Sequence, residues 1–377
     1  MKKIRVLIVD DSVVIRRLVT DILTGDPGIE VAGVAANGRI ALEKIPQVNP
    51  DIVILDVEMP EMDGLQALKL LRKGHPRLPV IMFSMLTERG ATITMDALAL
   101  GANDYVAKPA NVGSAALGME RVRQDLIPKI KALCGVREPL RLSAAPSAAP
   151  ALMNAKRSPR AAHHGQQRID VVAIGVSTGG PNALAELMPG FPSGFPVPIV
   201  IAQHMPPIFT RFLADRLNGK TELTVREGIA GAELRAGEAW IAPGDYHMVL
   251  GKTAIGARIE LQQEPPENSC RPAVDMLFRS VAKVYGAASL AVILTGMGQD
   301  GYRGCELIYD AGGQILAQDE ASSVVWGMPR FVAQAGLADS VLPLKQIAGE
   351  IIRRVAAGRE AAPGRKGETL GHGYLRR

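Results

Sequence analysis

The chain has 377 residues, which is too long for one ordinary hydrophobic core and predicts two domains. Hydrophobic residues make up 47% and charged residues 21% of the sequence, a balance typical of soluble α/β proteins. No segment approaches the length of a membrane span, and the apolar run near the start stops at Asp10, too early for a signal peptide. Cys134, Cys270 and Cys305 have no short spacing, so we expect neither disulfides nor a zinc site, as in a cytoplasmic protein.

The net charge of +5 raises the question of nucleic-acid binding, so its location matters. Residues 135–168 hold six basic residues and one acidic residue, and residues 359–377 hold five basic and two acidic residues. These two segments together exceed the whole net charge, which leaves the rest of the chain acidic. Because no helix-turn-helix pattern and no basic face accompany them, we expect no nucleic-acid partner.

Four short apolar runs alternate with helical patterns near the start of the chain, and polar residues follow each run. The runs are Ile4–Val9, Ile52–Leu55, Pro79–Phe83 and Tyr105–Ala107. The residues that follow them are Asp10 and Asp11, Asp56, Ser84 and Lys108. Such alternation predicts a parallel sheet, and chemistry in these sheets collects at the carboxyl ends of the strands.

These residue types together indicate phosphoryl transfer. Three carboxylates at one sheet edge supply the oxygen ligands that Mg²⁺ prefers. Lys108 can pair with a carboxylate or a phosphoryl oxygen, and the Ser84 hydroxyl can hydrogen-bond one. Each aspartate alone could equally be a turn or helix-cap residue, but the combination predicts that Asp56 is phosphorylated.

Residues 3–122 resemble a response-regulator receiver domain, and the resemblance implies a flavodoxin-like fold. It also implies that Asp56 is the phosphoacceptor. Asp10, Asp11 and the backbone carbonyl of Glu58 would then help Asp56 to hold Mg²⁺.

The same resemblance assigns a switch to the later strands. Ser84 is implied as the switch hydroxyl, Tyr105 as the aromatic residue that follows it, and Lys108 as the phosphate partner. In this family the peptide bond between Lys108 and Pro109 is usually cis, so a cis bond is expected here.

Composition divides the remainder of the chain. We place the receiver domain at residues 1–125, with its last helix ending near Cys134, and a flexible linker rich in Ala, Pro and Ser at 126–167. A second domain is expected at residues 168–357, and a disordered basic tail at 358–377. The apolar runs IDVVAIG, VPIVIA and SLAVILTG are typical of buried parallel strands, which predicts a doubly wound, mainly parallel α/β fold.

The first of these strands ends in GVSTGGP, which matches the spacing G-x-S-x-G around Ser177. Glycines there allow a tight strand-to-helix turn that exposes the serine, and a helix N-terminus favours a developing oxyanion. The motif alone leaves three interpretations open: Ser177 as a helix N-cap, the glycines as a phosphate cradle, or Ser177 as a nucleophile.

The second strand, Val197–Ala202, ends in Gln203 and His204. A dinucleotide site would require G-x-G-x-x-G and an acidic residue at this strand end, whereas a histidine here suits a serine nucleophile. The other histidine of this domain, His247, lies in a turn-rich stretch and could equally pack or line the substrate surface. We therefore favour His204 as the base.

The third strand, Leu290–Thr295, is followed by GMGQDG. Asp300 could be a turn residue, but its place at another strand end makes it the best candidate to orient His204. The glycines beside Met297 leave its backbone N–H free to point into the site. The order of serine, histidine and aspartate differs from that of α/β-hydrolases, so we expect a separate use of the same geometry.

The motifs GVSTGGP, AQHM, APGDYHM and LTGMGQDG, in this order behind a receiver domain, resemble the chemotaxis protein-glutamate methylesterase family. The resemblance implies a triad of Ser177, His204 and Asp300 and an oxyanion hole that includes the Met297 backbone N–H. Thr178, beside the nucleophile, is implied to have a supporting role.

The resemblance further implies a phosphorylation-activated enzyme that removes methyl esters from chemoreceptor glutamates, releases methanol and also deamidates receptor glutamines. A chemotaxis histidine kinase would be the phosphodonor, the hydrolytic site would need no cofactor, and membrane contact would come only through the receptors. Two alternatives stay open on the sequence: an acyl hydrolase with another substrate, and a non-catalytic signalling scaffold.

Overall fold

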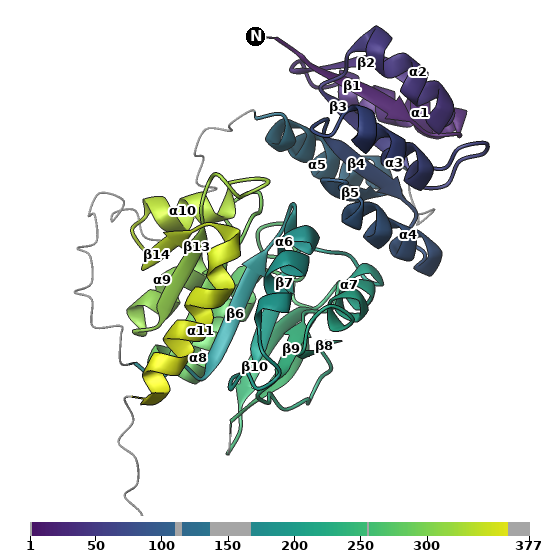
Figure 1. Ribbon diagram of the computed structural model, residues 1–377. Helices are drawn as coiled ribbons and strands as arrows, with labels where there is room; N and C mark the ends of the chain where they lie inside the picture. Colours follow the sequence, from purple (N-terminus) through teal and green to yellow (C-terminus); the bar gives the residue numbers. More distant parts are fainter. Residues whose placement is uncertain (1, 110–114, 136–166, 255, 361–377) are drawn as a thin grey trace, which may run out of the picture.

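The computed structural model describes residues 2–109, 115–135, 167–254 and 256–360, in two α/β domains (Figure 1). Most of the expected linker and basic tail lies outside these residues. Among the helices of the described residues, none is long and apolar enough to cross a membrane.

The first domain alternates strands and helices as expected. Its elements are β1 (Ile4–Val9), α1 (Val13–Thr24), β2 (Ile29–Ala35), α2 (Gly38–Val48), β3 (Ile52–Asp56), α3 (Gly64–Gly74), β4 (Val80–Ser84), α4 (Glu88–Ala99), β5 (Asp104–Ala107) and α5 (Ala115–Leu133). Helix α5 ends beside Cys134 and thus runs past residue 125, because Leu126 and Ile130 continue its buried face.

The strands form one parallel sheet in the order β2-β1-β3-β4-β5, which confirms the flavodoxin-like prediction. Neighbouring residues of β1 point to opposite faces: Ile8 packs with α1 and α5, whereas Leu7 packs with α2, α3 and α4. Since both faces are covered, the central strands are continuous apolar runs rather than alternating ones.

Polar side chains fix where the first four helices of this domain begin. Ser12, Asn37, Asp63 and Thr87 each accept a hydrogen bond from the backbone N–H three residues later. The loops between strand and cap therefore stay short, which holds the polar residues at the carboxyl edge of the sheet.

The second domain is larger and combines a central sheet with a separate hairpin. Its elements are β6 (Val171–Val176), α6 (Gly180–Leu187), η2 (Met188–Gly190), β7 (Ile199–Gln203), α7 (Phe209–Asn218), β8 (Thr224–Glu227), β9 (Glu238–Ile241), β10 (His247–Lys252), β11 (Ala257–Gln262), α8 (Val274–Tyr285), η3 (Gly286–Ala288), β12 (Ser289–Ile293), α9 (Tyr302–Asp310), β13 (Gln314–Gln318), α10 (Met328–Gln334), β14 (Ser340–Leu342) and α11 (Leu344–Glu360).

The seven-stranded sheet has the order β14-β13-β12-β6-β7-β9-β8, and all its strand pairs are parallel. From β6 the chain builds outward through β7 on one side, then returns to build outward through β12 on the other. The strand order therefore reverses beside β6, and such a reversal opens a crevice at the carboxyl ends. The antiparallel hairpin β10–β11 packs on the α8 side of the sheet.

The two domains contact each other along α4 of the first domain and α6 and α7 of the second (Figure 1). The ring of Tyr105 stacks on that of Phe209, with centroids 4.8 Å apart and planes 7° apart. Asn182 Nδ2 donates to the Ala102 carbonyl oxygen at 3.1 Å. Tyr105 is consequently buried, although it lies at the edge of its own sheet.

Two arginines of α7 add polar contacts at this interface. Arg211 forms an exposed ion pair with Glu88, and Arg216 donates to the carbonyl oxygen of Met95. The interface is thus apolar at Tyr105 and polar at its rim.

Candidate active site

Three strand ends of the second domain bring Ser177, His204 and Asp300 together beside β6. The Ser177 hydroxyl lies 3.0 Å from His204 Nδ1, and His204 Nε2 lies 2.7 Å from an Asp300 carboxylate oxygen. Ser177 follows β6, His204 follows β7, and Asp300 lies in the loop after β12. The predicted serine, histidine and aspartate therefore form one continuous hydrogen-bonded chain, the arrangement of a nucleophile, a base and an orienting carboxylate.

The turn after Ser177 argues against two of the three interpretations of its motif. The N-cap of α6 is Gly179, with a φ of 77°, so Ser177 does not cap the helix. A Cβ on Gly179 would meet Val324, and one on Gly180 would lie 2.0 Å from Gln203 Oε1. These glycines are required by protein packing rather than by space for a phosphate.

Gln203 ties the serine and histidine loops together. Its side-chain Nε2 donates to the carbonyl oxygens of Ser177 at 3.0 Å and His204 at 3.1 Å. Both loops also hydrogen-bond along the sheet, because Ser177 N donates to Thr295 O and His204 N donates to Val176 O. The nucleophile and the base are therefore held by the sheet itself.

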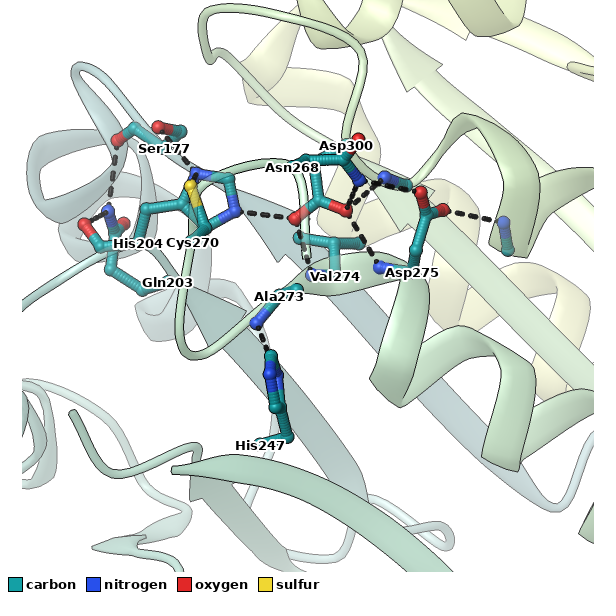
Figure 2. A network of polar contacts seen from close by, with 12 residues as sticks. Ser177, Gln203, His204, His247, Asn268, Cys270, Ala273, Val274, Asp275 and Asp300 are labelled. Atoms are coloured by element: carbon teal, nitrogen blue, oxygen red, sulfur yellow. Dashed lines mark hydrogen bonds and ion pairs between the residues drawn. The ribbon is translucent and has the colours of Figure 1, made fainter. Parts of the chain in front are cut away.

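Asp300 is buried and accepts hydrogen bonds from every side (Figure 2). Besides His204, its donors are the backbone N–H groups of Val274, Asp275 and Gly301 and the side-chain amide of Asn268. Burial alone would raise the pKa of Asp300, but these bonds, with that from His204 first among them, lower it below its ordinary value. Asp300 thus stays ionised beside the histidine.

Asp275 is a second buried carboxylate behind Asp300. It accepts from Gly304 N at 2.6 Å and from Asn268 Nδ2 at 2.9 Å, so one amide serves both acids. Burial and the charge of Asp300 raise the pKa of Asp275 to about 7.

The pKa of His204 lies well above its ordinary value. Burial acts to lower it, but the interactions of the ring with Cys270 and with the Asp300 carboxylate outweigh that effect. Cys270 Sγ lies 3.4 Å from the same Nδ1 that faces Ser177.

The two residues implied to support the reaction lie beside the serine. Gly296 packs so closely on Ser177 that a Cβ there would be 2.8 Å from the serine Cβ, which places Met297 next to the nucleophile. Within the described residues, the Met297 backbone N–H donates to no protein acceptor. The Thr178 side chain is buried and lies near Asp104 of the first domain. Burial raises the pKa of Asp104.

His247 does not reach this site. Its Nδ1 accepts from Ala273 N at 3.2 Å (Figure 2). Its Nε2 lies 3.2 Å from the Pro265 carbonyl oxygen. With both ring nitrogens bonded to backbone, His247 links the β10 strand to the loop before α8.

In the first domain, Asp10, Asp56 and Lys108 meet at the carboxyl edge of the sheet. Lys108 Nζ lies 2.8 Å from Asp10 and 2.7 Å from Asp56. Burial, together with the Asp10 charge, raises the pKa of Asp56 to about 6, while Lys108 opposes the shift. The carboxylate is therefore largely ionised at neutral pH, as a nucleophile must be.

A metal ion fits between the acidic residues. Ligand oxygens of Asp10, Asp11 and Asp56 lie within 4.8 Å of one another, and carboxylates are the ligands that Mg²⁺ prefers. The Glu58 side chain pairs with Arg89 at 2.7 Å.

The switch residues lie beside this site but in different surroundings. Ser84 Oγ donates to the Gly90 carbonyl oxygen at 3.2 Å, so the hydroxyl is directed to α4 rather than to Asp56. Tyr105 is covered by Phe209. The expectation of a cis bond at Lys108–Pro109 is wrong: among the described residues the cis bond is Arg271–Pro272, and Lys108–Pro109 keeps the trans form that X–Pro bonds ordinarily prefer.

Sequence reasoning missed Asn268, Cys270 and Asp275. All three lie in or just after the loop that precedes α8, and none follows a strand of the central sheet. The available signal was a polar segment, ENSCRPAVD, ahead of an amphipathic helix, which also describes an ordinary surface loop.

Comparison with known proteins agrees with this division of the chain. A family model described as the CheB methylesterase matches residues 172–351, and one described as the response regulator receiver domain matches residues 6–115. Ser177, His204 and Asp300 all lie within the first match, and Asp56 lies within the second.

Curated relatives span both domains. A protein-glutamate methylesterase/protein-glutamine glutaminase of Trichodesmium erythraeum is 55% identical, covering 94% of this chain and 100% of its own length. A protein of the same name from Nocardioides sp. is 52% identical and covers 94% of this chain and 96% of its own length. The crystal structure of the Thermotoga maritima CheB methylesterase catalytic domain is 43% identical, with a TM-score of 0.48, and covers 49% of this chain and 97% of that chain.

Proposed function

Because the chain belongs to the protein-glutamate methylesterase/protein-glutamine glutaminase family, we propose that Ser177, His204 and Asp300 carry its hydrolytic reaction. The protein is a carboxylic ester hydrolase with a response-regulator receiver domain. The observation that carries the proposal is the unbroken chain of hydrogen bonds from Ser177 through His204 to Asp300.

Hydrolysis proceeds through a covalent intermediate. Ser177 Oγ attacks the carbonyl carbon of a γ-glutamyl methyl ester while His204 Nδ1 takes its proton, and Asp300 stabilises the resulting imidazolium. The Met297 backbone N–H, which donates to no acceptor in the part of the chain that the structure describes, donates to the tetrahedral oxyanion. Methanol leaves with the proton from His204, and water then releases the glutamate by the same steps.

A glutamine side chain fits the same chemistry. Its amide carbonyl accepts the serine, and ammonia leaves in place of methanol, which turns glutamine into glutamate. Methyl-esterified glutamates and glutamines of chemoreceptors are the proposed substrates.

The receiver domain controls this reaction through Asp56, with a chemotaxis histidine kinase as the proposed phosphodonor. Asp10, Asp11, Asp56 and the Glu58 carbonyl would hold Mg²⁺, which neutralises charge on the transferring phosphoryl group when bound. Lys108 already contacts Asp56 and can bind a phosphoryl oxygen.

In the unphosphorylated protein, the receiver covers the side of the hydrolytic domain that carries the nucleophile. Thr178, next to Ser177, contacts Asp104, and Asn182 on the following helix contacts Ala102. Phosphorylation of Asp56 shifts the side chains of Ser84 and Tyr105. Because the Tyr105 ring stacks on Phe209, its movement breaks this contact between the domains. The switch therefore loosens this interface, as a population shift biased by a local change of charge.

The test is methanol release from methyl-labelled chemoreceptor membranes, with and without a small-molecule phosphodonor and Mg²⁺. We expect release that rises with the phosphodonor. Ser177→Ala should lose on the order of 10⁶-fold in turnover, as in a strong triad. Asp56→Asn should keep the basal rate and lose the stimulation.

Two results would contradict the proposal. Full turnover by Ser177→Ala would remove the serine from the reaction. Hydrolysis of small esters without any release from receptors would favour an acyl hydrolase with another substrate.

A further inference from the structure

Two side chains compete for one nitrogen of the catalytic histidine. Cys270 Sγ lies 3.4 Å and Ser177 Oγ 3.0 Å from His204 Nδ1 (Figure 2). When Nε2 donates to Asp300, Nδ1 of the neutral ring has a single lone pair, so it can accept a proton from only one of them at a time.

The thiol is the stronger acid of the two competitors. A free cysteine titrates near pH 8.5, whereas an aliphatic hydroxyl does not titrate in water, so transfer from Cys270 is far less costly than transfer from Ser177. The product of that transfer is a thiolate beside an imidazolium, in which the bond between sulfur and hydrogen is exchanged for one between Nδ1 and hydrogen.

The surroundings of the ring favour this charged pair. Only 13% of the His204 side-chain surface is exposed. Among the described residues, the titratable groups that contact the ring are Cys270 from the loop before α8 and Asp300 from the loop after β12. Asp275 lies behind Asp300. No cation opposes the imidazolium among these facing groups, and two unlike charges in contact stabilise each other strongly at low dielectric.

We propose that Cys270 is a positioning residue that forms a thiolate–imidazolium pair with His204 and thereby withholds the base from Ser177. The pair stores the Nδ1 proton in the resting enzyme, and Ser177 is activated only from the minor form in which the proton is back on sulfur or has left the pair. The inference rests on the proposed role of His204 as the base. It is not implied by the triad, which is complete without Cys270.

The first experiment reads the thiolate directly and needs no esterase activity. The full-length protein is treated with methyl methanethiosulfonate at pH 6, where a thiolate forms a methyl disulfide and releases methanesulfinate but an ordinary thiol is almost inert. Labelled cysteines are located by mass spectrometry. We expect rapid labelling of Cys270, at least 100-fold slower labelling in His204→Ala, and unchanged labelling in Ser177→Ala.

The chain supplies its own matched controls. Burial raises the pKa of Cys134 to about 11 and raises that of Cys305 well above its ordinary value. Neither should label at pH 6. Labelling of Cys270 that is no faster than that of Cys134 would overturn the proposal, even if Ser177→Ala abolishes esterase activity and the proposed function stands.

The second experiment measures the protonation of His204 through the pH dependence of the reaction. The acid limb of the profile of kcat/KM against pH should move down by about one pH unit or more in Cys270→Ala, because His204 then becomes neutral at lower pH. Cys270→Ser keeps the size and the hydrogen bond but not the acidity, so it should follow Cys270→Ala. A profile for Cys270→Ser that matches the wild type would mean that the thiol acts by packing alone and would contradict the proposal. Titration of the receiver is common to all variants and cancels in the comparison.

Discussion

At the residue scale, Asp275 and Asp300 are two buried carboxylates whose pKa values are shifted in opposite directions from the ordinary value of an aspartate. Asp300 faces His204 and three backbone N–H groups, which lower its pKa. Burial and the charge of Asp300 raise the pKa of Asp275 to about 7. The pKa values of two neighbouring acids separate in this way because two negative charges close together repel each other. Asp275 therefore takes up a proton on folding at mildly acidic pH, and Asp300 does not.

Asp275→Asn should flatten the dependence of stability on pH. The pKa of Asp275 is raised in the folded protein, so its contribution is greatest below the unfolded value near 4 and is lost as pH rises to about 7. Between pH 5 and 7.5 we expect the wild type to lose on the order of 2 kcal/mol more of its unfolding free energy than Asp275→Asn does. Urea unfolding at the two pH values measures this, with the exposed Asp215→Asn as control. Equal losses in wild type and Asp275→Asn would refute the assignment.

Asn268→Gly should lower turnover by about tenfold, because a hydrogen bond to a charged group contributes roughly 1.5–3 kcal/mol and Asn268 donates to Asp300. Glycine is the appropriate replacement, since Asn268 has a φ of 52°. Ser269→Gly is the matched control, because Ser269 has a φ of 63° and the hydrogen bonds to Asp300 come from other residues. We expect kcat to fall in the first variant only, with KM unchanged. A tenfold loss in both variants would assign the effect to loop flexibility instead.

Ser177, His204 and Asp300 could be predicted because each follows a recognisable apolar strand, and parallel strands place such residues together. Asn268 and Cys270 could not be predicted, since their positions depend on a loop in which both Asn268 and Ser269 have a positive φ, and no periodicity signals that conformation. Asp275 lies in the first turn of α8, where an acidic residue ordinarily interacts with the helix dipole in solvent.

At the scale of elements, the position of α8 determines the environment of Asp300. The helix approaches β6 so closely that a Cβ on Gly175 would lie 2.3 Å from Val274 Cγ1. The Val274 backbone N–H donates to Asp300 at 2.6 Å. Packing between a strand glycine and the first residue of a helix therefore sets the distance between that helix and the active site.

Gly175→Ala should cost about 1–3 kcal/mol of stability and reduce esterase activity, because α8 must move away from β6. Combining it with Val274→Ala removes the clashing methyl groups, so the double variant should regain part of both losses. Gly74→Ala is the control, since a Cβ there meets no atom within 4 Å. Urea unfolding and methanol release test these variants together with Val274→Ala alone. A double variant whose losses are simply the sum of those of the two single variants would argue against the contact.

The alternation of strands and helices made the parallel sheets predictable, but several strands were not predicted, among them β2, β8, β9, β13, β14 and the hairpin β10–β11. Strand β2 has a mostly half-exposed pattern and no apolar run that distinguishes it from a loop. The hairpin β10–β11 is antiparallel and lies outside the parallel sheet, and β11 is mostly half-buried, so β11 gives a weaker signal than the buried parallel strands do.

At the scale of the whole molecule, the domain interface combines an aromatic stack with an ion pair at its rim. Arg211→Glu places two acidic residues together at Glu88 and should raise the basal rate of methanol release a few-fold, since an exposed pair contributes at most about 1 kcal/mol and its reversal somewhat more. The swapped double variant Arg211→Glu with Glu88→Arg should return to the wild-type rate. The basal rates of methanol release, measured without phosphodonor, test this expectation. A basal rate that does not respond to the single reversal would argue against inhibition through this interface.

The stack of Tyr105 on Phe209 also couples the two domains in both directions. If phosphorylation of the receiver weakens its contact with the hydrolytic domain, then that contact must disfavour phosphorylation of Asp56 by the same factor, because a coupling free energy is reciprocal. Any substrate surface that displaces the receiver from Phe209 thereby makes Asp56 easier to phosphorylate. A chemoreceptor that engages the hydrolytic domain would act as an effector of the receiver as well as a substrate.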